Sequence, residues 1–332
     1  MIDEKDLDYH HLGCDDPTWA ETYFLIFSCA EEAISGNAYI LSRPNVGVAL
    51  GSVYIHQGIC HNTWEADYSD APMHLPTPEK LSDFVFDNGL GVTGSNKARD
   101  YRFHYNGRDG LCKFDLNFKG IMDPFDALDP QHNPLVETFD SAEEATRFEG
   151  WSGGHYDLVG HITGTLELYG KTYQIDCYDG LDRSWGPRLE WDASPVSWMH
   201  MGFGDDLAFH LVMTVVMTDG SYRSDELRFG YVTVDGETCG IVEARVIGKN
   251  DGMLGAYREV TIRDVKGREW TLSGTAVAAA PWHTAYASFI SFQTLYRWTM
   301  GERTAFSSVA EVIGQTTLSK RFSRLGKAGQ NL

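Results

Sequence analysis

The chain of 332 residues has the composition of a soluble, folded protein, with 42% hydrophobic, 13% aromatic and 22% charged residues. Its 47 acidic and 27 basic residues give a formal net charge of −20, which disfavours binding to nucleic acid or to an anionic membrane surface. No apolar run approaches the ~20 residues that span a bilayer, and the acidic N-terminus has neither the basic nor the apolar region of a secretory signal. We therefore expect a cytoplasmic protein that neither binds nucleic acid nor inserts into a membrane; the sequence leaves a homodimer open.

In the first half of the chain, short apolar runs rich in β-formers alternate with turn residues, and helical periodicity is almost absent. This pattern is typical of an antiparallel all-β fold. The predicted strands of this half are Glu21 to Cys29, Asn37 to Ser42, Val48 to His56, Tyr101 to Tyr105 and Leu111 to Phe118.

Gly89-Leu90-Gly91-Val92-Thr93-Gly94 matches the GxGxxG pattern of dinucleotide-binding proteins. That fingerprint requires a following helix, whose N-terminus holds the pyrophosphate. Here the segment Ser95 to Asp100 leads quickly into another predicted strand. We therefore predict a glycine-rich hairpin or bulge at this place, and no cofactor.

The segment Gly154 to Trp185 is the most informative part of the chain, because it reads as a hairpin that ends in a charged, aromatic loop. His155 to Leu168 is the first predicted strand, Tyr169-Gly170-Lys171 the turn, and Thr172 to Tyr178 the returning strand. A loop is predicted from Asp179 to Arg188. Loops held by rigid strands often carry chemistry, so this loop is the leading candidate for a site.

The second half shows the same strand pattern, with Asp-Gly and Lys-Gly turn signals between the runs. Its predicted strands are Ser197 to Phe203, Leu207 to Met217, Arg223 to Val234, Gly240 to Ile247, Ala256 to Asp264, Glu269 to Ala278 and Ala305 to Ile313. Each half thus holds roughly the eight strands of a small barrel. We predict domains 1–191 and 192–332, with a boundary near Trp191, and a short helix from Asp140 to Phe148.

Cysteine and histidine spacing predicts neither disulfides nor a metal site. The six cysteines are far apart and form no CxxC pair, which is typical of reduced thiols. The twelve histidines are accompanied by no HExxH element. His155 and His161 are six residues apart, so a straight strand would separate their backbones by roughly 20 Å.

A family resemblance appears in four motifs: Trp19 to Phe24, Arg43 to Gly47, Gly154-His155-Tyr156, and Asp182 to Arg188. Together they resemble the AttH-like and hydroxyneurosporene synthase (carotenoid 1,2-hydratase) superfamily. The resemblance implies a tandem of two lipocalin-like β-barrels. It also implies acid-catalysed change to a small apolar, isoprenoid-like molecule, or simple binding of one.

Asp182 is the residue we expect to act as acid or base, because the resemblance places a catalytic Asp in a similar turn. An aromatic, desolvated setting raises the pKa of a carboxyl group and lets it donate a proton near neutral pH. His155, Tyr178 and Asp179 are its candidate catalytic partners. The candidate substrate-binding residues are Arg183, Trp185, Trp191, Trp198 and His200.

Three interpretations of the chain remain open. In the first, the protein is a metal-free hydratase or dehydratase, isomerase or cyclase that acts on an isoprenoid- or steroid-like substrate between the barrels. In the second, it is a non-catalytic carrier of a lipid or terpenoid. Asp182 would then only fix the joint between the domains, and the tryptophans would pack a core. In the third, the protein is an interaction scaffold that uses its acidic surface.

Overall fold

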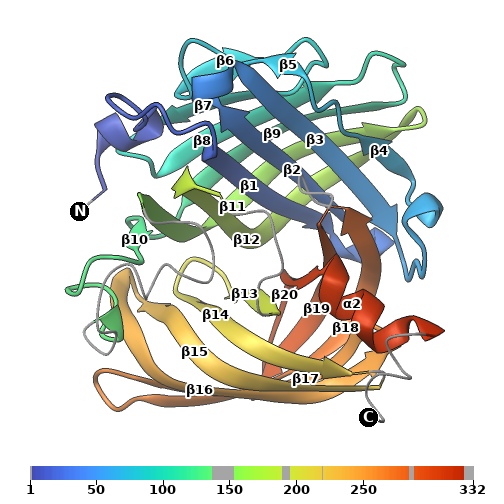
Figure 1. The fold of residues 1–332 in the computed structure, drawn as a ribbon. Helices are drawn as coiled ribbons and strands as arrows, with labels where there is room; N and C mark the ends of the chain where they lie inside the picture. The colour runs from blue at the N-terminus through green and yellow to red at the C-terminus, as the bar shows by residue number, and fades with distance from the viewer. Residues whose placement is uncertain (1, 137–152, 189–194, 219, 284–287, 325–332) are drawn as a thin grey trace.

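The computed structural model describes residues 2–136, 153–188, 195–218, 220–283 and 288–324. Almost all of its regular structure is antiparallel β-sheet, in two units that lie against each other (Figure 1). The prediction of an all-β, lipocalin-like tandem is confirmed. The strand pairing closes only the second unit into a barrel, whereas the first is a curled sheet that stays open.

The first unit is a twelve-stranded sheet with the main order β4-β3-β2-β1-β12-β11-β9-β8-β7-β6, to which β5 and β10 are added. The predicted long strands of this half are all present. Its strands are β1 (Trp19–Cys29), β2 (Ile34–Arg43), β3 (Val48–Gln57), β4 (Tyr68–Asp70), β5 (Leu75–Pro76), β6 (Asp83–Val85), β7 (Gly91–Ser95), β8 (Asp100–Asn106), β9 (Cys112–Gly120), β10 (Phe125–Asp126), β11 (Gly154–Leu168) and β12 (Lys171–Pro187).

The GxGxxG segment lies in the hairpin of β6 and β7, which confirms the predicted glycine-rich hairpin. Gly91 faces His104 on β8, and a Cβ at Gly91 would lie 2.3 Å from the His104 ring. The glycine at this position thus permits close packing of a side chain.

The second unit is a closed barrel in which eight strands pair in chain order. The predicted strands of this half include every barrel strand except β19 (Phe289–Met300). The strands are β13 (Val196–Gly202), β14 (Leu207–Thr218), β15 (Ser221–Val234), β16 (Glu237–Asp251), β17 (Leu254–Asp264), β18 (Glu269–His283), β19 and β20 (Arg303–Gly314). A short helix, α2 (Gln315–Phe322), follows.

The β11–β12 hairpin is longer than predicted, and the expected loop is wrong. Residues 179–187 continue β12 to Pro187, because the far half of β12 pairs with β1 on its other side, from Leu25 opposite Leu181 to Trp19 opposite Pro187. Asp182 therefore sits on a rigid strand with a neighbour on each side.

The hairpin turn fixes which residues face each other across β11 and β12. Tyr169 and Gly170 both have positive φ, 51° and 78°, as a two-residue type I′ turn requires. Leu168 consequently pairs with Lys171, and the continuous register that follows sets Asp157 directly opposite Asp182.

The two units share one hydrophobic core along their contact. The cluster that fills the first sheet continues into residues on the outer surface of the barrel, among them Trp198, Phe229 and Trp282. The barrel interior is a separate cluster that includes Met199 and Met201. The outer face of the first sheet therefore packs on the outside of the barrel, and Figure 1 shows β11, β12 and β1 on the side of the sheet nearest to it.

Some of the expectations fall on residues outside the described ranges. These are Trp191, with the predicted domain boundary, and the predicted helix from Asp140 to Phe148. The boundary stays a prediction; the first sheet ends at Pro187 and the barrel begins at Val196. Throughout the ranges that are described, no helix has the length and apolar character needed to cross a membrane.

Candidate functional site

The site begins with a row of side chains that crosses five strands on the face toward the barrel. Phe125 on β10, Asp157 on β11, Asp182 on β12, Phe24 on β1 and Tyr39 on β2 are successive cross-strand partners. Directly opposed residues project from the same face of a sheet. Two carboxyl groups thus stand side by side in the middle of the row, with aromatic rings on both sides.

Asp157 is completely buried and lies against three polar side chains. His155, on the same face of β11 two residues away, lies with Nε2 2.6 Å from Asp157 Oδ2. Trp198 Nε1 donates to Asp157 Oδ1 at 2.9 Å, and His210 Nε2 lies 3.5 Å from the same oxygen. Both carboxylate oxygens therefore face hydrogen-bonding groups, which favours the ionised form of Asp157.

The two carboxyl groups differ in pKa. Burial acts to raise the pKa of Asp157, but the charges and hydrogen bonds of His155 and His210 outweigh it and hold this pKa well below its usual range. Burial raises the pKa of Asp182 to about 7, with the Asp157 charge adding to the rise and His155 and Arg188 opposing it. A pair of carboxyl groups whose pKa values are pushed apart is the arrangement that assigns one as base and the other as acid.

The barrel covers this pair with two stacked imidazoles. His200 on β13 and His210 on β14 are completely buried, and their ring centroids lie 4.3 Å apart. Burial, and then the neighbouring His210, hold the pKa of His200 well below its usual value. His200 is thus neutral at physiological pH and adds no charge beside the carboxyl pair.

Aromatic rings form the wall on the β1 side of Asp182. Phe24 stacks on Trp198 at 4.9 Å between centroids and on Trp282 at 5.8 Å. Trp198 thereby contacts both halves of the site, since its ring lies on Phe24 and its N–H binds Asp157. Asp182 itself is half-buried, while Asp157 has no exposed surface.

Two sets of side chains offer potential metal ligands within 4.8 Å of one another: Asp157 with His200 and His210, and His155 with Asp157 and Asp182. In both sets, Asp157 already accepts a hydrogen bond from Trp198 Nε1 and lies within hydrogen-bond distance of His155 Nε2.

The structure brings together Asp182, His155, Trp198 and His200 among the predicted site residues. Asp179 is near them: its Oδ1 accepts from the Gly180 N–H at 2.9 Å and lies 3.8 Å from His200 Nδ1. Burial raises the pKa of Asp179 to about 7, against the opposing bonds from Gly180 and Ser308.

Arg183 and Trp185 lie on the opposite face of β12, inside the first sheet, away from the carboxyl pair. Arg183 is buried, donates to the carbonyl oxygens of Asp6 and Asp8, and lies 3.1 Å from Glu21 Oε2. Trp185 stacks on His10 with centroids 3.7 Å apart. Neighbouring residues of a strand point to opposite faces, so Arg183 and Trp185 face away from Asp182. Both contact the N-terminal segment instead.

Tyr178 also lies apart from the carboxyl pair, nearer the start of β12. Its hydroxyl donates to Asp205 Oδ1 at 3.0 Å, and its ring stacks on His161 at 4.5 Å. It thus makes a contact between the two units. Trp191 is outside the described residues.

Sequence reasoning missed Asp157, His210, Phe24 and Trp282. A signal existed for Asp157: a two-residue turn at Tyr169-Gly170 pairs it with Asp182, and it shares a strand face with His155. His210, Phe24 and Trp282 come from separate strands, and no spacing in the chain links them to Asp182.

The fold and the position of this pair define a tandem lipocalin-like protein with a titratable cluster between its two units. Residues 3–312 match the model of a domain of unknown function, DUF7064, and the chain belongs to this family. No curated protein sequence matches it.

Two solved structures share the fold. Kievitone hydratase from Nectria haematococca is 10% identical, with a TM-score of 0.52 over 90% of this chain and 89% of that one. An AttH protein from Nitrosomonas europaea is 12% identical, with a TM-score of 0.51 over 89% of this chain and 92% of that one. The two likenesses confirm the fold that the predicted family resemblance implied.

Proposed function

We propose that this protein is a hydratase-type acid/base enzyme that acts on a small apolar, isoprenoid- or steroid-like alkene between its two units. The observation that carries the proposal is the opposed pair Asp157 and Asp182, whose pKa values are displaced in opposite directions. A protonated Asp182 near pH 7 is a general acid that needs no metal. The fold shared with kievitone hydratase supports the same reaction class.

The proposed reaction is hydration of a carbon–carbon double bond. Asp182 donates its proton to one alkene carbon, and the oxygen of a water molecule forms a bond to the other. The surplus proton of that water returns to the Asp182 carboxylate, directly or through His155, which restores the starting state. The reverse sequence of steps is dehydration.

The aromatic wall is the part of the site that would stabilise the positively charged intermediate of the proposed reaction. Protonation of an alkene leaves positive charge on carbon, and a cation is stabilised over the face of an aromatic ring. Phe24 lies directly opposite Asp182 across β1 and β12, and Trp198 stacks on it. The ionised Asp157 adds a fixed negative charge beside the same place.

The test is incorporation of labelled water. A panel of acyclic terpenoid alkenes, steroid alkenes and kievitone is incubated with the protein in ¹⁸O-labelled water, and products are read by mass spectrometry. We expect a labelled hydroxyl with the wild type, loss of at least a hundredfold in rate with Asp182→Asn, and full activity with Asp176→Asn, an exposed position on the same strand. Full turnover by an Asp182→Asn variant that binds ligand normally would count against the proposal.

A carrier of a lipid or terpenoid is the second candidate. In a carrier, Asp157, His200 and His210 would serve only as a structural joint between the two units. Their complete burial favours the carrier, because such a joint is buried. Native mass spectrometry of protein purified from its own host would identify a retained ligand. Recovery of that ligand unchanged and unlabelled after incubation in ¹⁸O-labelled water would support the carrier.

A further inference from the structure

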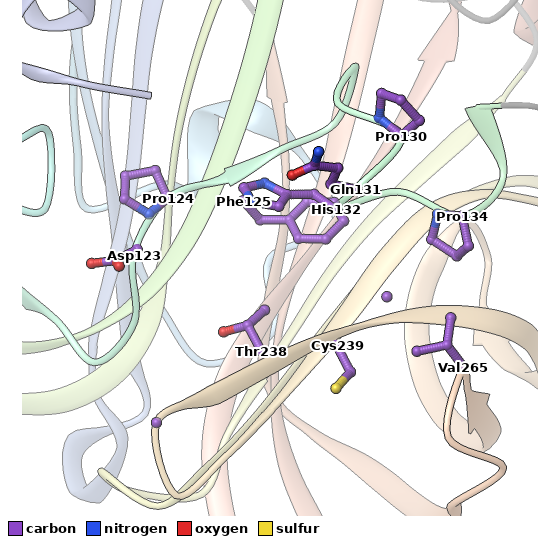
Figure 2. A pocket seen from close by; sticks show the side chains of 12 residues that line it. Asp123, Pro124, Phe125, Pro130, Gln131, His132, Pro134, Thr238, Cys239 and Val265 are labelled. Atoms are coloured by element: carbon purple, nitrogen blue, oxygen red, sulfur yellow. The ribbon is translucent and has the colours of Figure 1, made fainter. Parts of the chain in front are cut away.

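A pocket of about 510 Å³ lies between the segment that carries β10 and the barrel (Figure 2). One wall is the segment that carries β10, with Phe125, His132 and Pro134; the other is formed by Thr238, Cys239 and Val265. Small-molecule sites in proteins typically have volumes of ~300–1,000 Å³. The volume therefore suits a ligand of two or three fused or linked rings.

The walls of the pocket are fixed in place by close backbone packing. A Cβ at Gly240 would lie 2.4 Å from Pro134 Cδ and 2.6 Å from the His132 carbonyl oxygen, so the β10 segment rests directly on β16. The Val265 N–H donates to the Gly240 carbonyl oxygen at 3.0 Å, which holds the two parts of the second wall together. The cavity between these walls is thus built into the fold.

The chemistry of the walls selects a neutral, planar ligand. Phe125 and His132 stack, with centroids 5.6 Å apart and planes 27° apart, and present a flat aromatic surface. His132 Nδ1 accepts the Asp126 N–H at 3.0 Å, so the neutral ring carries its proton on Nε2, as a donor. The described lining includes Asp123 and neither lysine nor arginine, which disfavours an anion.

We propose that this pocket is a binding site for a neutral, planar aromatic molecule that bears a hydroxyl or carbonyl group. Phe125 separates it from the carboxyl pair: the residue lies opposite Asp157 across β10 and β11, and its ring packs on Tyr231 at 4.9 Å. The site does not depend on the reaction proposed above, because its ligand would bind on the far side of this ring.

The test uses 2-naphthol as the probe and calorimetric titration of the full chain. Val265 is 51% exposed at the rim, so Val265→Trp places an indole in the pocket without disturbing a core, and Val265→Thr is the matched control. We expect saturable binding of one 2-naphthol to the wild type, to Val265→Thr and to Asp182→Asn, and at least a tenfold weaker affinity in Val265→Trp.

Absence of binding to the wild type would overturn the proposal. Binding that survives in Val265→Trp and is lost in Asp182→Asn would also overturn it, since the probe would then occupy the carboxyl-pair site.

Discussion

Gly180 lies directly against the imidazole of His200, so closely that a Cβ on Gly180 would be 1.8 Å from His200 Cε1. This contact joins β12 of the first sheet to β13 of the barrel, next to Asp179 and two residues from Asp182. Gly180, which the sequence places in a predicted loop, is thus a packing requirement of the joint between the two units.

Gly180→Ala should therefore loosen that joint. The added methyl group must displace the His200 ring or the strand that carries it, and overpacking of this kind costs about 1–3 kcal/mol. Urea unfolding measures the loss, with the exposed Thr172→Ala on the same strand as the control. An unchanged midpoint would mean that the two units do not pack as described.

Asp182→Asn should remove a pH dependence of stability. Because burial raises the folded-state pKa of Asp182 to about 7, above its unfolded value of ~4, its contribution favours folding at low pH and declines as pH rises between these values. The free energy of unfolding, measured by urea from pH 4 to 8, should fall less steeply with pH in Asp182→Asn than in the wild type. Asp179 acts in the same direction, so part of the slope should remain until Asp179→Asn is added.

Trp198→Phe should remove one of the two contacts of the Trp198 indole and keep the other. Phenylalanine keeps an aromatic ring against Phe24 but removes the N–H that binds Asp157 at 2.9 Å. A hydrogen bond to a buried charge contributes about 1.5–3 kcal/mol, so stability should drop by this amount. Trp282→Phe, which also stacks on Phe24, is the control and should cost less; equal losses would contradict the role of the N–H.

Arg183→Met should destabilise the protein far more than Arg102→Met. Arg183 and Glu21 form an ion pair with both side chains fully buried, and removal of one partner leaves a buried charge, at a cost of about 3–5 kcal/mol. Arg102 and Asp115 form an exposed pair, worth at most ~1 kcal/mol. Thermal unfolding compares the two, and a small loss in Arg183→Met would show that Arg183 does not hold the N-terminal segment.

The sequence by itself determined the all-β class, most of the long strands and the hairpin that carries the candidate acid. Turn dipeptides and alternating apolar residues are local signals, and strands and tight turns form from local preferences. The turn at Tyr169-Gly170 also determines the pairing of Asp157 with Asp182, because a two-residue turn fixes the register of the two strands that it joins.

Only the tertiary structure decided what surrounds Asp182. Residues 179–187 look like a loop in isolation, yet they form a strand because β1, more than 150 residues earlier in the chain, supplies their second set of hydrogen bonds. It also decided that Arg183 faces away from the site and that His210 and Phe24 face into it. These placements follow from the packing of one sheet on the outside of a barrel. Contacts between residues so distant in the chain produce no regular spacing in the sequence from which they could be predicted.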